Sequence, residues 1–186
     1  MSRTLSLFVA VASLVALAAG CGSSGGSSSS TTTTASATET WASGVCTSIT
    51  TWQSALTSAA GSLKSDPTKN GLQTAADDAK SATQTLASDL KGLGKPDTAA
   101  GQQAKDSLDQ LATNLQKDVD TIESTVKGVS GVSGVLGAVT TVTATLATMK
   151  TQVKTTFTDL QGLGANDELK NAFANSASCD SLTSGS

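Results

Sequence analysis

Three cysteines are the residues of this sequence whose chemistry is most specific, and the chain contains no histidine. A cysteine thiol can be joined to a lipid, can pair in a disulfide and, as a thiolate, can bind a metal ion. Cys21 directly follows an apolar N-terminal segment, whereas Cys46 and Cys179 lie near the two ends of the region with a core-forming pattern. These positions predict one use of the thiol group near the N-terminus and another within the fold.

Residues 17–21, Leu-Ala-Ala-Gly-Cys, resemble the lipobox of bacterial lipoproteins, in which diacylglycerol is joined to the cysteine thiol and the chain is then cut directly before that cysteine. The preceding residues have the parts of a secretory signal, because Arg3 supplies a positive charge and residues 5–17 form an uncharged apolar stretch. The sequence predicts a lipoprotein signal peptide over residues 1–20 and a lipid anchor on Cys21. The alternative is an ordinary secreted protein whose cleavage site precedes a cysteine.

The other two cysteines are predicted to form a disulfide. An exported protein matures in an oxidising compartment, where disulfides persist. With Cys21 joined to lipid, Cys46 and Cys179 remain as an even pair. A bond between them would join the first predicted helix to the last, and by chain entropy a loop of this length contributes about 4–5 kcal/mol to stability. Two free buried thiols are the alternative.

Composition excludes several classes of chemistry. Without histidine there is no Ser-His-Asp or Cys-His catalytic arrangement and no Glu-x-x-His di-iron motif. Loss of the signal peptide removes Arg3, the single arginine, and leaves eleven lysines against fifteen carboxylates, so nucleic acid binding is not expected. The acidic pairs Asp77 with Asp78 and Asp118 with Asp120 lie inside predicted helices and are expected to face solvent. We predict no metal, no cofactor and no enzyme activity, and a Ser-Lys pair is the remaining enzymatic alternative.

The region between the anchor and the first helix is predicted to be a flexible tether. Residues 21–37 are almost all Ser, Thr and Gly and carry no charge. Sixteen such residues span about 20–24 Å on average. The folded domain is expected over residues 38–182, held at this distance from the bilayer.

The apolar period of that domain is helical. From residue 38 onward apolar residues recur at steps of three and four rather than at the step of two that a strand shows. We predict an all-α fold, an up-down bundle of four long helices plus a short C-terminal helix, closed by one disulfide. The apolar stripes cover residues 41–63, 72–93, 104–126 and 135–160, with a short fifth stripe over 169–173.

Turn-forming residues place the ends of these helices. Asp66 is expected to cap the second helix with Pro67 at its first position, and Pro96 to begin the third. Glycines recurring at every third position over residues 128–137 are expected to form a loosened turn before the fourth helix. Asn166 is expected to cap the fifth.

Residues 128–149 contain no charged side chain, a length sufficient to cross a bilayer. The stretch is rich in Ser, Thr and Gly, and its apolar and hydroxyl residues fall on separate faces. A buried bundle helix is therefore the favoured interpretation. A membrane segment is the first alternative, and a mobile Gly-Val turn that contacts lipid or a partner is the second.

Two tryptophans are candidates for a ligand pocket. Trp41 and Trp52 are eleven residues apart, about three helical turns, so they lie almost on one line of the first helix. Core packing beside the disulfide is the favoured interpretation. The alternative is that both rings form the aromatic wall of an internal pocket for an apolar ligand.

The spacing of these residues resembles a known group of proteins. Trp41, Cys46 five residues on and Trp52 six residues later, followed by an Ala-rich helical domain and a late Cys179, are similar to uncharacterised actinobacterial secreted proteins and lipoproteins. The resemblance covers residues 40–182. It implies an actinobacterial envelope setting and a disulfide between Cys46 and Cys179, and it carries over no activity.

We therefore expect a non-enzymatic module, lipid-anchored on the extracytoplasmic face of the cell membrane, that binds or scaffolds an envelope protein or a lipid. The alternative function is a carrier or sensor that holds a small apolar ligand or lipid in the bundle core.

Overall fold

The computed structural model describes residues 36–163 and 167–183. The expected signal peptide, the lipid-bearing Cys21 and the tether up to residue 35 lie outside the described residues, and so does Asn166.

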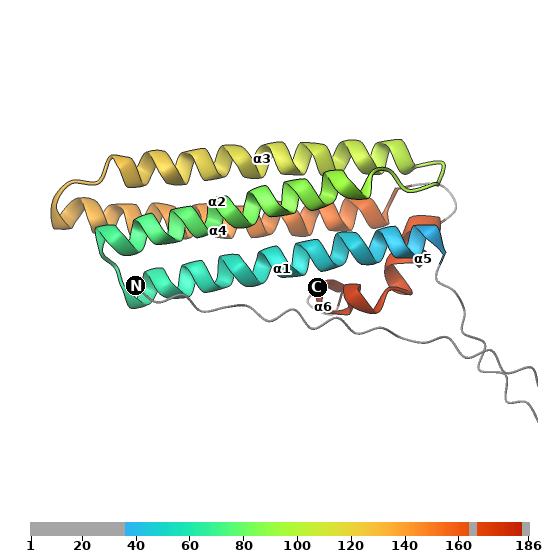
Figure 1. The fold of residues 1–186 in the computed structure, drawn as a ribbon, viewed down its shortest axis with the longest axis horizontal. Coiled ribbons are helices and arrows are strands. Elements are labelled where there is room, and N and C mark those ends of the chain that lie inside the picture. Colours follow the sequence, from blue (N-terminus) through green and yellow to red (C-terminus); the bar gives the residue numbers. More distant parts are fainter. Residues whose placement is uncertain (1–35, 164–166, 184–186) are drawn as a thin grey trace, which may run out of the picture. The chain divides into compact units, whose positions relative to one another are not determined.

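Four long helices run alternately up and down, and three short helical segments follow them (Figure 1). The long helices are α1 (Ala37–Ser65), α2 (Lys69–Leu93), α3 (Gly101–Lys127) and α4 (Gly131–Gln161). The short segments are α5 (Glu168–Ala174), the 3-10 helix η1 (Ala177–Cys179) and α6 (Asp180–Thr183). The described ranges contain no strand, and the predicted all-α class with four long helices is confirmed.

Each long helix buries one stripe of apolar side chains, as the helical period predicts. In α3 every apolar position of the predicted stripe is buried: Ala104, Leu108, Leu111, Leu115, Val119, Ile122 and Val126. In α2 the stripe contains Ala75, Ala76 and Ala79, whose small side chains allow a neighbouring helix to approach closely. The large indole of Trp52 fills the core on the α1 side.

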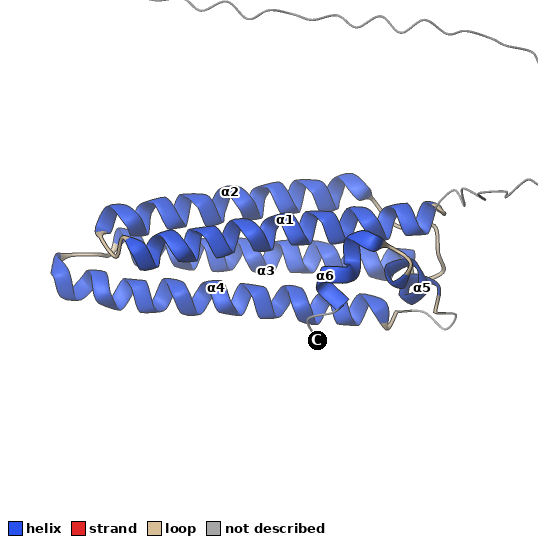
Figure 2. Ribbon diagram, turned by 90° about the horizontal axis from the view of Figure 1, so that it is seen from below, coloured by secondary structure: helices blue, strands red, loops and turns tan. Residues whose placement is uncertain are grey.

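The C-terminal region is more broken than the single short helix that was predicted. After α5 the chain leaves the helix at Asn175, turns at the buried Ser176 and continues as η1 and α6. This path brings Cys179 back to Cys46 on α1, which a straight continuation of α5 would not do. Seen from below, the short segments lie over the seam between α1 and α4 (Figure 2).

Two predicted helix starts are wrong by a few residues. The cap of α2 is Thr68, whose hydroxyl accepts a hydrogen bond from the Gly71 amide at 3.1 Å. Asp66 instead ends α1, and its carbonyl oxygen accepts from the Thr68 amide at 2.8 Å. In the next connection the Thr98 amide bonds to the Pro96 carbonyl oxygen at 2.9 Å, and this turn delays the start of α3 to Gly101.

The predicted loosened turn before α4 is shorter than expected. Only residues 128–130 separate α3 from α4, and Gly134 and Gly137 lie inside α4. The helix extends this far because Val135 and Val139 pack partly against the core. Gly131 takes the left-handed conformation at the first position of α4, with φ of 65°, which favours glycine.

The α1–α2 turn depends on a missing side chain at Gly71. A Cβ atom there would lie 2.0 Å from the Asp66 carbonyl oxygen, whereas one at Gly61 would meet nothing within 4 Å. We expect Gly71→Ala to lower the free energy of unfolding by about 1–3 kcal/mol through overpacking. The matched Gly61→Ala substitution should raise it by up to about 1 kcal/mol, the helix propensity difference. Urea unfolding of both variants checks the prediction, and equal effects of the two would contradict it.

Candidate functional site

The disulfide is the best defined of the predicted site features. Cys46 on α1 and Cys179 on η1 are bonded, with their Cα atoms 5.1 Å apart, and both are fully buried. The bond joins residues separated by 133 positions in the sequence. The predicted pairing is confirmed, and the alternative of two free thiols is wrong.

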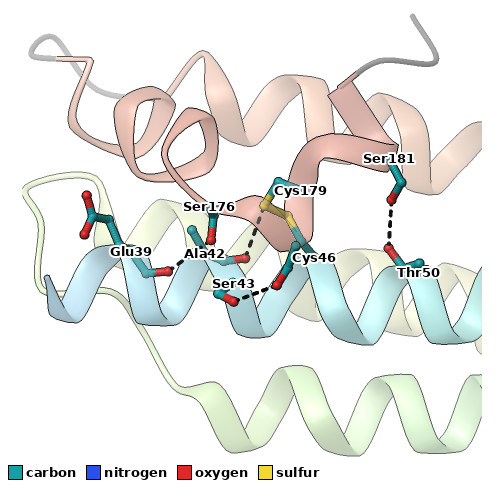
Figure 3. The surroundings of a disulfide bond; sticks show 9 residues. Glu39, Ala42, Ser43, Cys46, Thr50, Ser176, Cys179 and Ser181 are labelled. Carbon is teal, nitrogen blue, oxygen red and sulfur yellow. Dashed lines mark hydrogen bonds between the residues drawn. A yellow bond between two sulfur atoms is a disulfide. The ribbon is translucent and has the colours of Figure 1, made fainter. Parts of the chain in front are cut away.

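Hydroxyl groups flank the disulfide along α1 (Figure 3). Ser43 and Ser178 share a hydrogen bond of 3.0 Å between their Oγ atoms, and Thr50 and Ser181 share one of 3.5 Å on the other side of the bridge. The C-terminal segment is thus held against α1 by covalent and polar contacts on both sides of Cys179.

Glu39 joins the start of α1 to the end of α5. Its carboxylate accepts from the Ser36 amide at 2.7 Å, and the Ser36 hydroxyl accepts from the Glu39 amide at 3.1 Å, which together form a capping box. The other carboxylate oxygen accepts from Asn175 Nδ2 at 3.3 Å, and Ser176 Oγ donates to the Glu39 carbonyl oxygen at 3.5 Å. One side chain therefore both caps the first helix and fastens the C-terminal segment.

Trp41 is a packing residue at this end of the bundle. Its ring N–H donates to the Gly94 carbonyl oxygen at 3.2 Å, and only 5% of the residue is exposed. The indole meets Phe173 edge-on, with ring centroids 5.9 Å apart, and Phe173 meets Phe157 at 5.1 Å. These three rings tie α1, α5 and α4 together, and such edge-to-face pairs are favourable beyond their burial.

Trp52 faces α2 and is 2% exposed. Its ring N–H donates to Thr83 Oγ1 at 3.2 Å, within the core. A groove of about 390 Å³ between α1 and α2 reaches this ring, and exposed residues such as Ser81 and Asp89 line its rim. Trp41 does not line that groove, so the structure does not bring the two indoles together into one aromatic wall.

A second groove, of about 260 Å³, lies where α1, α4 and α6 meet. Its floor contains Ile49, Val153 and Phe157, and Lys150 stands at its edge. The Lys150 Nζ donates to Thr57 Oγ1 at 2.9 Å, which links α4 to α1 across the groove.

The largest apolar exposure in the described ranges is at the start of α4. Val132 is 80% exposed and Leu136 is 60% exposed. By length and composition alone α4 could cross a membrane: its most apolar window has a mean hydropathy of 1.5, and only 22% of that window is buried. The buried side of α4, which includes Val142, Leu146 and Met149, nevertheless packs in the bundle core.

Charged groups lie mainly on α2 and α3. Lys80 and Glu123 form a surface ion pair of 2.7 Å, and its hydrogen bond raises the pKa of Lys80 and lowers the pKa of Glu123.

At the α3–α4 interface, partial burial raises the pKa of Asp118. The hydrogen bond of 2.9 Å that Gln152 Nε2 donates to Asp118 opposes this shift in part. No cluster of three or more possible metal ligands occurs among the described residues.

No family model, curated protein or solved structure matches this chain. The resemblance to an actinobacterial envelope group therefore stays a prediction.

Some residues that organise this region were not predicted. Thr83 is 1% exposed and accepts a hydrogen bond from the Trp52 ring N–H. Its position in the α2 stripe, between Ala79 and Leu86, could have predicted that it is buried. The contact between Phe157 and Phe173 was hidden because helical period places both rings in the core without saying which of them meet.

The Trp52–Thr83 pair gives a direct test of a structural role. Thr83→Val keeps the shape of the side chain but leaves the indole N–H buried without an acceptor, so we expect a loss of about 1–3 kcal/mol in the free energy of unfolding. Thr83→Ser retains the hydroxyl and should cost less. Urea unfolding followed by tryptophan fluorescence compares the two, and a Thr83→Val protein as stable as the parent would contradict the assignment.

The Asp118–Gln152 contact predicts a dependence on pH. The pKa of Asp118 is raised in the fold, so its ionisation destabilises the native state as pH rises through that pKa. The Gln152 Oε1 atom is buried without a hydrogen-bond partner among the described residues. Asp118→Asn removes the charge and supplies a donor, so we expect it to raise stability at pH 7 by about 0.5–1.5 kcal/mol.

That gain should shrink in acid, where the parent Asp118 is itself protonated. Thermal unfolding across the pH range measures it, with Asp78→Asn as a control because Asp78 is exposed on α2. An Asp118→Asn protein less stable than the parent at pH 7 would refute the explanation.

Proposed function

We propose that this protein is a lipid-anchored, non-enzymatic binding or scaffold module on the extracytoplasmic face of the cell membrane. The observation that carries the proposal is the division of the three cysteines. Cys46 and Cys179 are bonded to each other in the fold, which leaves Cys21, at the end of the lipobox-like residues 17–21, as the remaining thiol of the sequence.

Two features of the domain support an envelope setting. A disulfide persists in an oxidising compartment, which the lipobox-like signal would provide. The bond also joins the C-terminal segment to the N-terminal half of α1, the helix that follows the tether.

The packing of the tryptophans favours a scaffold over the alternative carrier. Both indole N–H groups already have acceptors, Gly94 and Thr83, and both rings are buried. The groove at Trp52 has a solvent-exposed rim, whereas ligand pockets enclose most of their ligand. A module of this kind would act through its outer surfaces.

The anchor is tested by removing Cys21 in one variant and the two bonded cysteines in another. Cys21→Ala should release the protein from the membrane fraction, because diacylglycerol has no other proposed attachment site. The matched control is the double variant Cys46→Ala with Cys179→Ala, which loses the disulfide and should stay membrane-bound. Detergent phase partitioning gives the distribution, and intact-protein mass spectrometry gives the added lipid. A Cys21→Ala protein retained on membranes to the parent level would refute the anchor.

A further inference from the structure

The α3–α4 hairpin carries an apolar tip that the bundle does not cover. We define the hairpin tip as residues 129–139. Val132 and Leu136, one helical turn apart, are 80% and 60% exposed, while Val135 and Val139 pack partly against the core behind them. In both views this hairpin extends beyond the α1–α2 turn (Figures 1 and 2). The two exposed side chains therefore project at one end of the domain.

The surface that runs from this tip along α1 and α4 carries few charges, and those that line the groove between the two helices, Lys150 and Lys154, are basic. α2 and α3 together carry eight carboxylates, whereas α1 and α4 carry one each, Glu39 and Asp159. Residues 40–63 of α1 and 131–149 of α4 contain no charge. The Lys150–Thr57 bond shows that the two helices border the same face.

Several hydroxyl groups on the outer surface of α4 are already used by the helix itself. Thr140, Thr141, Thr145 and Thr148 each donate to the carbonyl oxygen four residues earlier, at 3.0–3.2 Å. Such bonds satisfy the side-chain donor without water. These four threonines therefore need less hydration than their hydroxyl groups suggest.

The tether enters at the opposite end of the bundle. α1 begins at residue 37, and its 29 residues extend about 43 Å toward the end that bears the hairpin tip. The fourteen residues between Cys21 and Ser36 span about 20 Å on average and about 50 Å at full extension. A tether this short keeps the entry end near the bilayer, and a domain twice as long as the average span can tilt until its far tip touches the same surface.

We propose that the hairpin tip is a second membrane contact, in which Val132 and Leu136 enter the bilayer surface and the part of the α1–α4 face next to the tip lies toward the lipid. This proposal rests on the proposed lipid anchor. The carboxylates of α2 and α3 then face water, away from anionic headgroups.

A bilayer fits this patch better than a second copy does. A stable protein interface buries about 1,200–2,000 Å² in total, which two aliphatic side chains per copy do not supply. Insertion into lipid needs no matching surface, and the anchor makes the contact intramolecular, so a weak apolar gain is sufficient. Burial of the two side chains should favour the docked orientation by roughly ten-fold or more.

Site-directed spin labelling of the lipidated full chain tests the contact. With Cys21 acylated and the other two cysteines bonded, Leu136→Cys introduces a single free thiol for a nitroxide label. The protein is reconstituted in vesicles of equimolar phosphatidylethanolamine and phosphatidylglycerol. We expect the label at 136 to be more accessible to oxygen than to a water-soluble nickel chelate, and the label on Gln84→Cys, exposed on α2, to show the reverse.

A second substitution separates lipid contact from local shielding. Val132→Asp, at a position 80% exposed, should leave the fold intact and return the 136 label to water, with a loss of roughly ten-fold or more in the docked population. Gln84→Asp adds the same charge to α2 and should leave the 136 label in lipid.

The outcomes separate the two proposals. A 136 label exposed to the nickel chelate, in protein that floats with the vesicles, overturns the tip contact and leaves the anchor standing. Protein that does not float overturns the anchor. A 136 label shielded from both reagents indicates contact with a second copy and also overturns the proposal.

Discussion

The bond between Cys46 and Cys179 is the constraint on which the arrangement of the bundle most depends. Successive long helices are joined by turns of three to seven residues, but α1 and α4 have no such connection. Their seam is closed by the C-terminal segment, which the disulfide fastens to α1 (Figure 3). A loop of this length contributes about 4–5 kcal/mol, against a typical total stability of about 5–15 kcal/mol. One covalent bond therefore supplies a substantial part of what holds the first and last long helices together.

Of the two tryptophans that looked most like a binding site, Trp41 serves this closure and Trp52 serves the α1–α2 interface. Trp41 packs through Phe173 onto Phe157 of α4, beside the bridge, and Trp52 pairs with Thr83 between α1 and α2. Each buried indole N–H has an acceptor, as polar groups in a core require. The tryptophans thus stabilise the fold at two interfaces of α1.

Helical period was sufficient to predict the bundle and the core positions of α3, because burial of one apolar stripe per helix leaves few alternatives. The bond between Cys46 and Cys179 was predicted on a different ground, the even pair of cysteines left in an exported chain. Helical period did not predict the helix ends, which depend on short-range backbone contacts. The cap of α2 moved from Asp66 to Thr68 because a carbonyl oxygen and the absence of a side chain at Gly71 set the turn. The contact between Trp41 and Gly94 was likewise out of reach, since it joins residues far apart in sequence.

α4 is both apolar and poorly buried, and its outer surface differs from that of the charged helix α3. Several of its threonine hydroxyls donate hydrogen bonds to carbonyl oxygens of the same helix. The outer surface of α4 therefore needs less hydration than its composition suggests. On α3, by contrast, solubility comes from ionic side chains such as Lys105 and Asp109, which bond to each other. Concentrating the ionic side chains on α2 and α3 leaves α1 and α4 with long stretches, residues 40–63 and 131–149, that carry no charge.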